Sequence, residues 1–165
     1  FGVVPSSFEV DDVLLTRPRD NDRECLVCHA ERELPVSNGG IQLRKMAPLR
    51  LALPGPGNAR RNRIEHYLNV NQIDVAELLE LDTMYGTLDL VANSDWVTIL
   101  PGILCLPDLD GRRRRVVPLA DPPLHVDYMR IETRQRPLTP AAQAFADVLQ
   151  EELNSALEIP PISQH

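Results

Sequence analysis

Two cysteines and a histidine stand close together in the segment Cys25-Leu-Val-Cys28-His29. The spacing C-x-x-C-H is typical of covalent haem attachment, and C-x-x-C alone is typical of a dithiol redox pair. Both chemistries need the two thiols side by side. Leu26 and Val27, between the cysteines, favour a buried strand, on which side chains three positions apart point to opposite faces. We therefore expect small buried thiols here, with a haem or redox protein as a rival interpretation.

Two polar turns could bind an anion. Pro54-Gly-Pro-Gly57 follows a strand-like run and precedes a predicted helix, and Asp82-Thr83 holds the same position before a second helix. Free N–H groups at the start of a helix attract anions. Neither turn has the glycine pattern of nucleotide-binding loops, so a plain strand-to-helix turn is the alternative interpretation.

Other polar residues do not form a catalytic pattern. Ser6-Ser7 has no G-x-S-x-G setting, and the four histidines are scattered along the chain. The basic run Arg112 to Arg115 is interpreted as a solvated turn, with nucleic-acid contact as the alternative. We therefore predict no enzyme activity, no cofactor and no metal site.

Apolar residues repeat with a period that alternates between two and about 3.6. Strands are expected at residues 1–4, 13–15, 25–28, 49–53, 76–81, 96–100 and 124–132. Helices are predicted after Asn58, after Asp82 or Thr83, and from Pro140, with Asn58 and Thr139 as N-caps. The alternation predicts an α/β fold with largely parallel sheets.

The helical periods also predict buried faces. In the first helix Ile64, Tyr67 and Leu68 share the apolar face, whereas the arginines of the segment Arg60–Arg63 lie mostly outside it. The apolar stripe of the last helix is predicted to contain Leu138, Ala142, Phe145, Leu149 and Leu153. After Glu158 the chain becomes proline-rich and is expected to be loose.

Composition limits the classes of function. The chain has 165 residues, of which 43% are hydrophobic, which suits one globular unit or two small subdomains. A net charge of -7 gives no support to direct nucleic-acid binding by this chain. No apolar run is long enough to span a membrane. Three cysteines without a disulfide pattern favour a reducing cytoplasm. Because the chain lacks an initiator Met, we interpret it as a fragment of a longer protein.

Five segments, in this order, resemble the effector-binding domain of LysR-type transcriptional regulators, which are bacterial proteins. The matching segments are Phe1-Gly-Val-Val-Pro-Ser6, Cys25 to Pro35, Ile41 to Pro48, Asp82 to Pro101 and Arg136 to Phe145. Asp82 to Pro101 is similar to the family's helix-then-strand "T-x-x-x-L-V-A-A-G-L-G-I-x-x-L-P". Arg136 to Phe145 is similar to its closing "R-x-L-S-P-A-A-x-A-F". Their order and spacing together carry the resemblance.

The resemblance implies a type-2 periplasmic-binding-protein-like fold, with two α/β subdomains joined by crossover segments. Subdomain I would hold residues 1–33 and 123–165, and subdomain II residues 34–122. A small molecule, expected to be an organic or aromatic carboxylate, would bind in the cleft between them. The residues predicted to bind it are Pro5, Ser6, Ser7, Pro54, Gly55, Asp82, Thr83 and Met84. Asp82, whose charge would repel a carboxylate, is expected to serve only as a helix cap.

Further expectations concern partners. A helix-turn-helix outside this chain would bind DNA, and the regulator would be a cytoplasmic homodimer or tetramer without membrane contact. Two departures from the family pattern stand out: Asn93-Ser-Asp-Trp96 replaces Ala-Gly-Leu-Gly, and His29 is followed by Ala30 instead of Pro. The alternative is a periplasmic solute-binding protein of the same fold.

Overall fold

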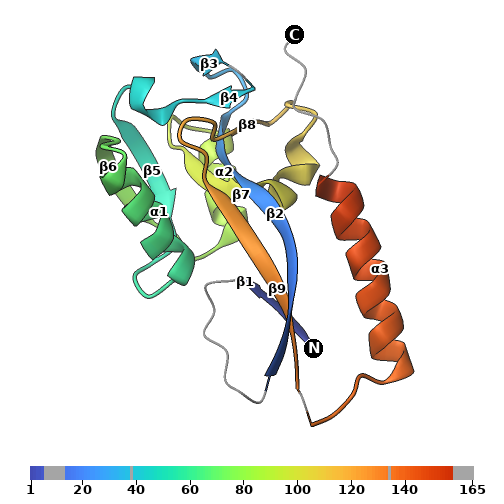
Figure 1. Ribbon diagram of the computed structural model, residues 1–165. Coiled ribbons are helices and arrows are strands. Elements are labelled where there is room, and N and C mark those ends of the chain that lie inside the picture. The colour runs from blue at the N-terminus through green and yellow to red at the C-terminus, as the bar shows by residue number, and fades with distance from the viewer. Residues whose placement is uncertain (6–13, 38, 134, 158–165) are drawn as a thin grey trace. The chain divides into compact units, whose positions relative to one another are not determined.

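The computed structural model describes residues 1–5, 14–37, 39–133 and 135–157 (Figure 1). Its strands are β1 (Gly2–Pro5), β2 (Leu14–His29), β3 (Val36–Ser37), β4 (Gly40–Ile41), β5 (Leu49–Leu53), β6 (Val75–Glu80), β7 (Thr98–Pro101), β8 (Arg114–Pro118) and β9 (His125–Thr133). Its helices are α1 (Ala59–Val70), α2 (Met84–Ala92) and α3 (Pro140–Leu157), with short 3₁₀ helices η1 (Leu43–Lys45) and η2 (Gly102–Asp108).

The three helices begin where the sequence predicts. The Asn58 side chain accepts a hydrogen bond of 2.9 Å from the N–H of Arg60, which confirms the first N-cap. The Thr139 hydroxyl accepts a bond of 3.2 Å from the N–H of Ala142, which confirms the last one. Ile64, Tyr67 and Leu68 are buried as predicted.

Several strand predictions were wrong. Leu14 and Leu15 of the strand expected at 13–15 belong to the same continuous strand, β2, as the segment expected at 25–28, and β2 runs through the polar residues between them. Residue 13 lies outside the described residues. The basic run expected to be a solvated turn enters strand β8 at Arg114, whose side chain is buried. The sheets are mixed: β5 and β6 are parallel, whereas β2 pairs antiparallel with both β7 and β8.

The chain forms two compact units. Unit 1 contains residues 1–22 and 125–160, and unit 2 contains residues 23–124. The division at 33/34 and 122/123 that the sequence suggests stays a prediction.

In unit 1, β1 pairs antiparallel with β9, from Gly2 opposite Ile131 to Pro5 opposite Tyr128. The stripe predicted for α3 was wrong at Phe145, which is 62% exposed, whereas its neighbour Ala146 is buried. The Phe145 ring instead lies against the Phe1 ring, with 6.0 Å between the ring centroids.

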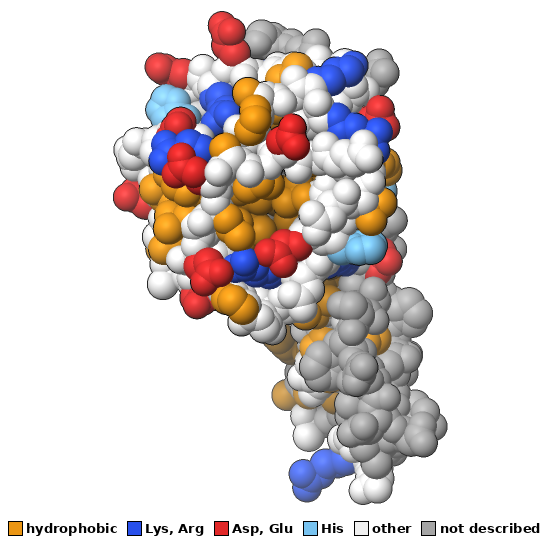
Figure 2. Space-filling model, turned by 90° about the vertical axis from the view of Figure 1, so that its left-hand side faces the viewer, with side chains coloured by type: hydrophobic (Ala, Val, Ile, Leu, Met, Phe, Trp, Pro, Cys, Tyr) orange, Lys and Arg blue, Asp and Glu red, His pale blue; other side chains and the backbone are white. Residues whose placement is uncertain are grey.

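The larger core cluster of unit 2 includes residues of β5 and α1, which lie beside each other in Figure 1. Leucines of β5 pack there against Ile64, Tyr67 and Leu68. Strand β6 is different, because none of its residues is buried and Val75 and Leu78 are 36% and 42% exposed. Figure 2 shows the face that carries α1 and β6, where an apolar area is bordered by charged side chains.

Candidate functional site

The pair β5–β6 forms a sheet separate from that of β2, β7 and β8, but an isolated bridge connects the two, so we call these strands together the unit 2 sheet. Two edges of it can be distinguished by strand direction. Strands β5 and β6 are parallel, and a parallel bridge from Leu51 to Val97 aligns the segment leading into β7 with them. Their carboxyl ends therefore meet at one edge, which we call the carboxyl edge. Strand β2 runs the opposite way, so Glu24, opposite Pro101, lies at this edge. Open α/β sheets bind ligands beyond the carboxyl ends of their strands.

The structure brings together the two turns that the sequence singled out. The backbone N–H of Gly55, just after β5, donates a hydrogen bond of 2.8 Å to Oδ1 of Asp82, just after β6. The prediction that Asp82 serves as a helix cap was therefore wrong. Its carboxylate joins the β5–α1 turn to the β6–α2 turn and occupies a backbone donor that a ligand anion would otherwise use.

Thr83 is the N-cap residue of α2, but its side chain makes no capping hydrogen bond. The first N–H groups of α2, including that of Met84, therefore lack a side-chain acceptor within the cap. Thr83 and Met84 are both exposed. Such a helix start attracts anions through its free N–H groups.

An ion pair that no sequence pattern predicted lies at the carboxyl edge. The Arg60 guanidinium donates from Nη2 to Oε2 of Glu24 at 2.8 Å and from Nε to Oε1 at 3.3 Å, and Nη2 also bonds the carbonyl of Ile99. The Glu24 side chain is 1% exposed and that of Arg60 is 21% exposed. Among the contacts of the described residues, Nη1 of Arg60 has no hydrogen-bond acceptor. Arg60 therefore combines a fixed position with unused donors.

Arg61 was also predicted outside the buried face of α1, and that prediction was wrong. Its guanidinium donates to Glu80 Oε1 at 2.7 Å, to Glu65 Oε1 at 2.9 Å and to the Pro54 carbonyl at 3.0 Å. The hydrogen bonds to Glu80 and then Glu65 raise the pKa of Arg61 above its usual value. Arg61 thus fixes the turn at Pro54. Its N–H groups donate to neighbouring residues, so we do not assign it to ligand binding.

The structure does not test the ligand-binding residues that the sequence predicts in unit 1. Pro5 is the last residue of β1. Ser6 and Ser7 lie outside the described residues. Their part in ligand binding stays a prediction, as does that of Pro54, Gly55, Asp82, Thr83 and Met84.

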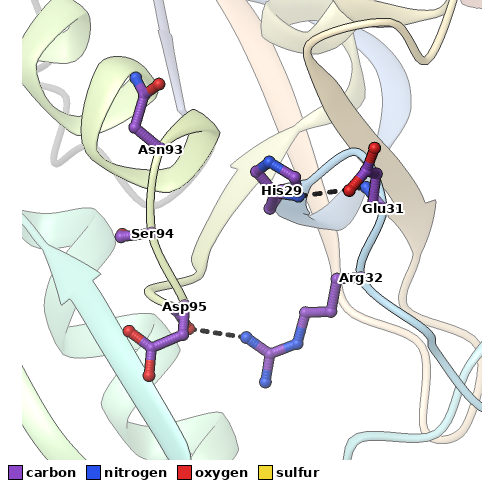
Figure 3. A pocket seen from close by; sticks show the side chains of 6 residues that line it. All are labelled: His29, Glu31, Arg32, Asn93, Ser94 and Asp95. Carbon is purple, nitrogen blue, oxygen red and sulfur yellow. Dashed lines mark hydrogen bonds between the residues drawn. The ribbon is translucent and has the colours of Figure 1, made fainter.

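The opposite edge of the same sheet carries a hollow of about 600 Å³. It is lined by His29, Glu31, Arg32, Asn93, Ser94 and Asp95 (Figure 3). The first three of these residues lie at or just after the carboxyl end of β2, and the last three lie just before β7. The hollow is therefore at the amino edge of the parallel strands. The site contains the histidine of the C-x-x-C-H segment and the first three residues of the departure Asn93-Ser-Asp-Trp96, but the sequence did not show that they meet.

The cysteines of that segment are not arranged for joint chemistry. Cys28 packs in the core cluster with Leu26 and Ile64, whereas Cys25 packs in a second cluster with Cys105. All three cysteines are buried, and none forms a disulfide. Burial raises the pKa of Cys28 to about 11, although Arg32 and Arg115 oppose that shift. The expected buried thiols are confirmed, and the haem and redox interpretations lose their geometric basis.

Two searches of the described residues give negative results. No group of three His, Cys, Asp or Glu side chains in this part of the chain is placed to hold a metal ion. None of the helices described has the length and apolarity needed to cross a bilayer.

Comparison with known proteins identifies the family. The LysR substrate binding domain matches residues 4–154, which is nearly the whole chain. The chain belongs to the LysR substrate-binding domain family. The predicted family is therefore confirmed, and with it the α/β, type-2 periplasmic-binding-protein-like fold. A search of curated proteins found no match.

Solved structures support the fold of this LysR substrate-binding domain. The Synechocystis PCC6803 CcmR regulatory domain in complex with 2-PG has a TM-score of 0.69 at 13% identity, covering 91% of this chain and 72% of that one. The BenM effector binding domain with its effector benzoate scores 0.67 at 17% identity, covering 96% and 72%. The full-length Pseudomonas aeruginosa OxyR C199D structure scores 0.65 at 16% identity, covering 99% of this chain but 51% of that one.

Proposed function

We propose that this LysR substrate-binding domain senses a small organic anion at the carboxyl edge of the unit 2 sheet. The observation that carries the proposal is Arg60, which is held by the buried Glu24 while Nη1 stays unused. A fixed guanidinium with spare donors suits carboxylate recognition. The starts of α1 and α2 add partial positive charge at the same edge.

The charges at this edge are consistent with an anionic ligand because the carboxylates there already have partners. Glu24 is bonded to Arg60, Glu80 to Arg61, and Asp82 to the Gly55 N–H. CcmR and BenM, which share the fold, are described in complex with 2-PG and with the effector benzoate, and benzoate is an aromatic carboxylate. We therefore propose an aliphatic or aromatic carboxylate as the effector, with Pro54, Gly55, Thr83 and Met84 around it.

The sensing role also fits what the family does in transcription. We propose that the domain has no enzyme activity, that it acts in a homodimer or homotetramer in the cytoplasm, and that DNA is bound by a separate helix-turn-helix. A ligand controls such a regulator only through its different affinities for two arrangements of the protein. The family match gives no support to the periplasmic solute-binding alternative.

The proposal is tested by thermal unfolding of the chain against a panel of aliphatic and aromatic carboxylates. A ligand at a hundredfold its Kd adds about 2.7 kcal/mol of stability, which raises the Tm by roughly 5–11 °C in a domain of this size. A shift with a carboxylate that the matching neutral amide does not produce supports the proposal. Equal shifts with acid and amide contradict the anion-binding part of it.

A further inference from the structure

The hollow at the amino edge lies far from Arg60 within unit 2. Its residue His29 ends β2, whereas Glu24, which holds Arg60, lies five positions earlier on the same strand. At about 3.3 Å per residue these positions are roughly 17 Å apart. The hollow is thus separate from the proposed effector site, and all of its lining residues belong to unit 2.

One wall of the hollow is the turn between α2 and β7. The side chains of Asn93 and Ser94 in this turn already form hydrogen bonds within the protein. The Asn93 amide donates to the Asp89 carbonyl at 2.8 Å, and the Ser94 hydroxyl donates to the Leu90 carbonyl at 2.6 Å. These bonds also satisfy carbonyls at the end of α2, which would otherwise favour a cation. Figure 3 shows the Asp95 carboxylate directed away from His29.

The negative charge of the Asp95 carboxylate is compensated by Arg50. Its Oδ1 accepts a bond of 2.6 Å from Arg50, and that hydrogen bond holds the pKa of Asp95 below its usual value. Arg50 also pairs with Glu77 at 3.0 Å and lies over the Trp96 ring at 4.6 Å from its centroid. The turn therefore presents no uncompensated carboxylate to the hollow.

The other wall offers donors. Nδ1 of His29 accepts a bond of 3.2 Å from the Glu31 N–H, which places the proton of a neutral ring on Nε2. Arg32 uses Nη1 to bond the Asp95 carbonyl at 2.6 Å, while Nη2 and Nε have no acceptor among the described residues. Arg115 donates to the Arg32 carbonyl at 3.2 Å and adds positive charge behind this wall. The opposing group is the exposed carboxylate of Glu31.

We propose that the amino-edge hollow is a second binding site, for a small molecule that carries a carboxylate or a phosphate group. The anionic group is held by the free donors of Arg32. Arg32 is fixed at both ends, because its guanidinium bonds Asp95 and its carbonyl accepts from Arg115. A guanidinium fixed in this way binds planar or tetrahedral oxyanions with little loss of side-chain freedom.

The test is an NMR titration of the ¹⁵N-labelled chain with inorganic phosphate and, separately, with acetate. The expected result is a saturable shift of the amides of residues 29–32 and 93–95 with at least one of the two anions. Arg32→Gln weakens that binding by about tenfold or more, because a charge-assisted hydrogen bond contributes roughly 1.5–3 kcal/mol. The matched control Arg112→Gln removes the same charge from an arginine outside the hollow and leaves the affinity unchanged.

Dispersed spectra show that each variant is folded. Arg32→Lys provides a second variant, which keeps the charge but loses the planar fork, and it should lower the affinity without altering the carboxyl-edge amides. Shifts that grow linearly with either anion and do not saturate contradict the proposal, as does equal affinity of Arg32→Gln and the unaltered chain. Arg60→Lys separates the two sites, because it changes binding at the carboxyl edge alone. The two proposals are therefore tested independently, and a result that contradicts one does not contradict the other.

Discussion

The Asp82 carboxylate accepts a 2.8 Å hydrogen bond from the backbone N–H of Gly55, a residue that lies 27 positions earlier in the chain. This bond joins the turns that follow two parallel strands, and it fixes the position of the two helix starts at the carboxyl edge. The same carboxylate adds negative charge where we propose that an anion binds. Asp82 therefore has two effects that substitutions can separate.

Asp82→Asn keeps an oxygen acceptor for Gly55 and removes the charge, so we expect tighter carboxylate binding with little loss of stability. Asp82→Ala removes both, and we expect it to lower the free energy of unfolding by about 0.5–1.5 kcal/mol. Urea unfolding and ligand titration measure the two effects. Asp74→Ala, an exposed carboxylate outside this edge, is the control. Weaker carboxylate binding by Asp82→Asn would contradict the assigned role.

A buried ion pair joins η2 to β8. Arg114 donates to Asp108 through Nε at 2.8 Å and Nη2 at 2.6 Å, and the two residues are 9% and 5% exposed. We expect Arg114→Met to lower the free energy of unfolding by about 3–5 kcal/mol, because it leaves a buried carboxylate without a partner. Urea denaturation measures the change. The exposed Arg112→Met should alter stability by less than about 0.5 kcal/mol, and equal effects of both variants would refute the assignment.

Gly40 is packed too closely for any side chain. A Cβ at this position would lie 2.5 Å from the Ala120 Cβ and 2.6 Å from the Pro118 carbonyl oxygen. Because one of these neighbours is backbone, we expect Gly40→Ala to cost about 1–3 kcal/mol in unfolding free energy. The double variant with Ala120→Gly should recover part of this loss, since it removes one of the two clashes. Thermal unfolding that leaves Gly40→Ala as stable as the unaltered chain would show that the strands separate more easily than the structure indicates.

The thiol of Cys28 should remain protonated in alkaline solution. Burial raises its pKa from 9.0 to about 11. A thiol whose pKa is raised on folding stabilises the native state below pH 9, and this contribution is lost as the pH rises from about 9 to about 11. At pH 9 we expect alkylation of Cys28 by iodoacetamide to be slow in the native chain and fast in urea, as measured by mass spectrometry of labelled peptides. Rapid native labelling would show that the strand opens readily.

Local patterns in the sequence predicted local structure well. The helix starts at Asn58 and Thr139 were predicted from capping residues, and the buried face of α1 from helical spacing, because these features depend on neighbours a few positions away. The failures involve distant partners. Arg61 is buried because it meets Glu80, 19 positions later, and Arg114 is buried because it pairs with Asp108 of a different element, although only six positions separate the two. No periodicity marks an arginine as buried when its compensating charge is supplied by another element.

The candidate sites show the same difference between local features, which the sequence predicted, and contacts between separate elements, which it did not. The turns at Gly55 and Asp82 were found from their positions before helices, although their hydrogen bond to each other was not expected. Arg60 was missed because its partner Glu24 lies 36 positions away on the crossover strand. The amino-edge hollow was missed because it joins the end of β2 to a turn 60 or more residues later, as the 63-residue separation of Arg32 and Asp95 shows.

The central claim is that Arg60, held by Glu24, recognises an effector carboxylate. Two substitutions should change affinity in opposite directions. Arg60→Lys keeps the charge but loses the planar fork, so we expect binding about tenfold weaker. Glu24→Gln keeps an acceptor for Arg60 and removes the compensating charge, so we expect tighter binding. Arg63→Lys on the same helix is the control and should leave the affinity unchanged.

The most direct measurement is isothermal titration calorimetry of the unaltered chain, Arg60→Lys and Glu24→Gln with the carboxylate that gives the largest thermal shift. Weaker binding by Arg60→Lys together with tighter binding by Glu24→Gln is the predicted result. Unchanged affinity in both variants, with stability lowered in each, would show that the pair only stabilises the fold and would contradict the claim.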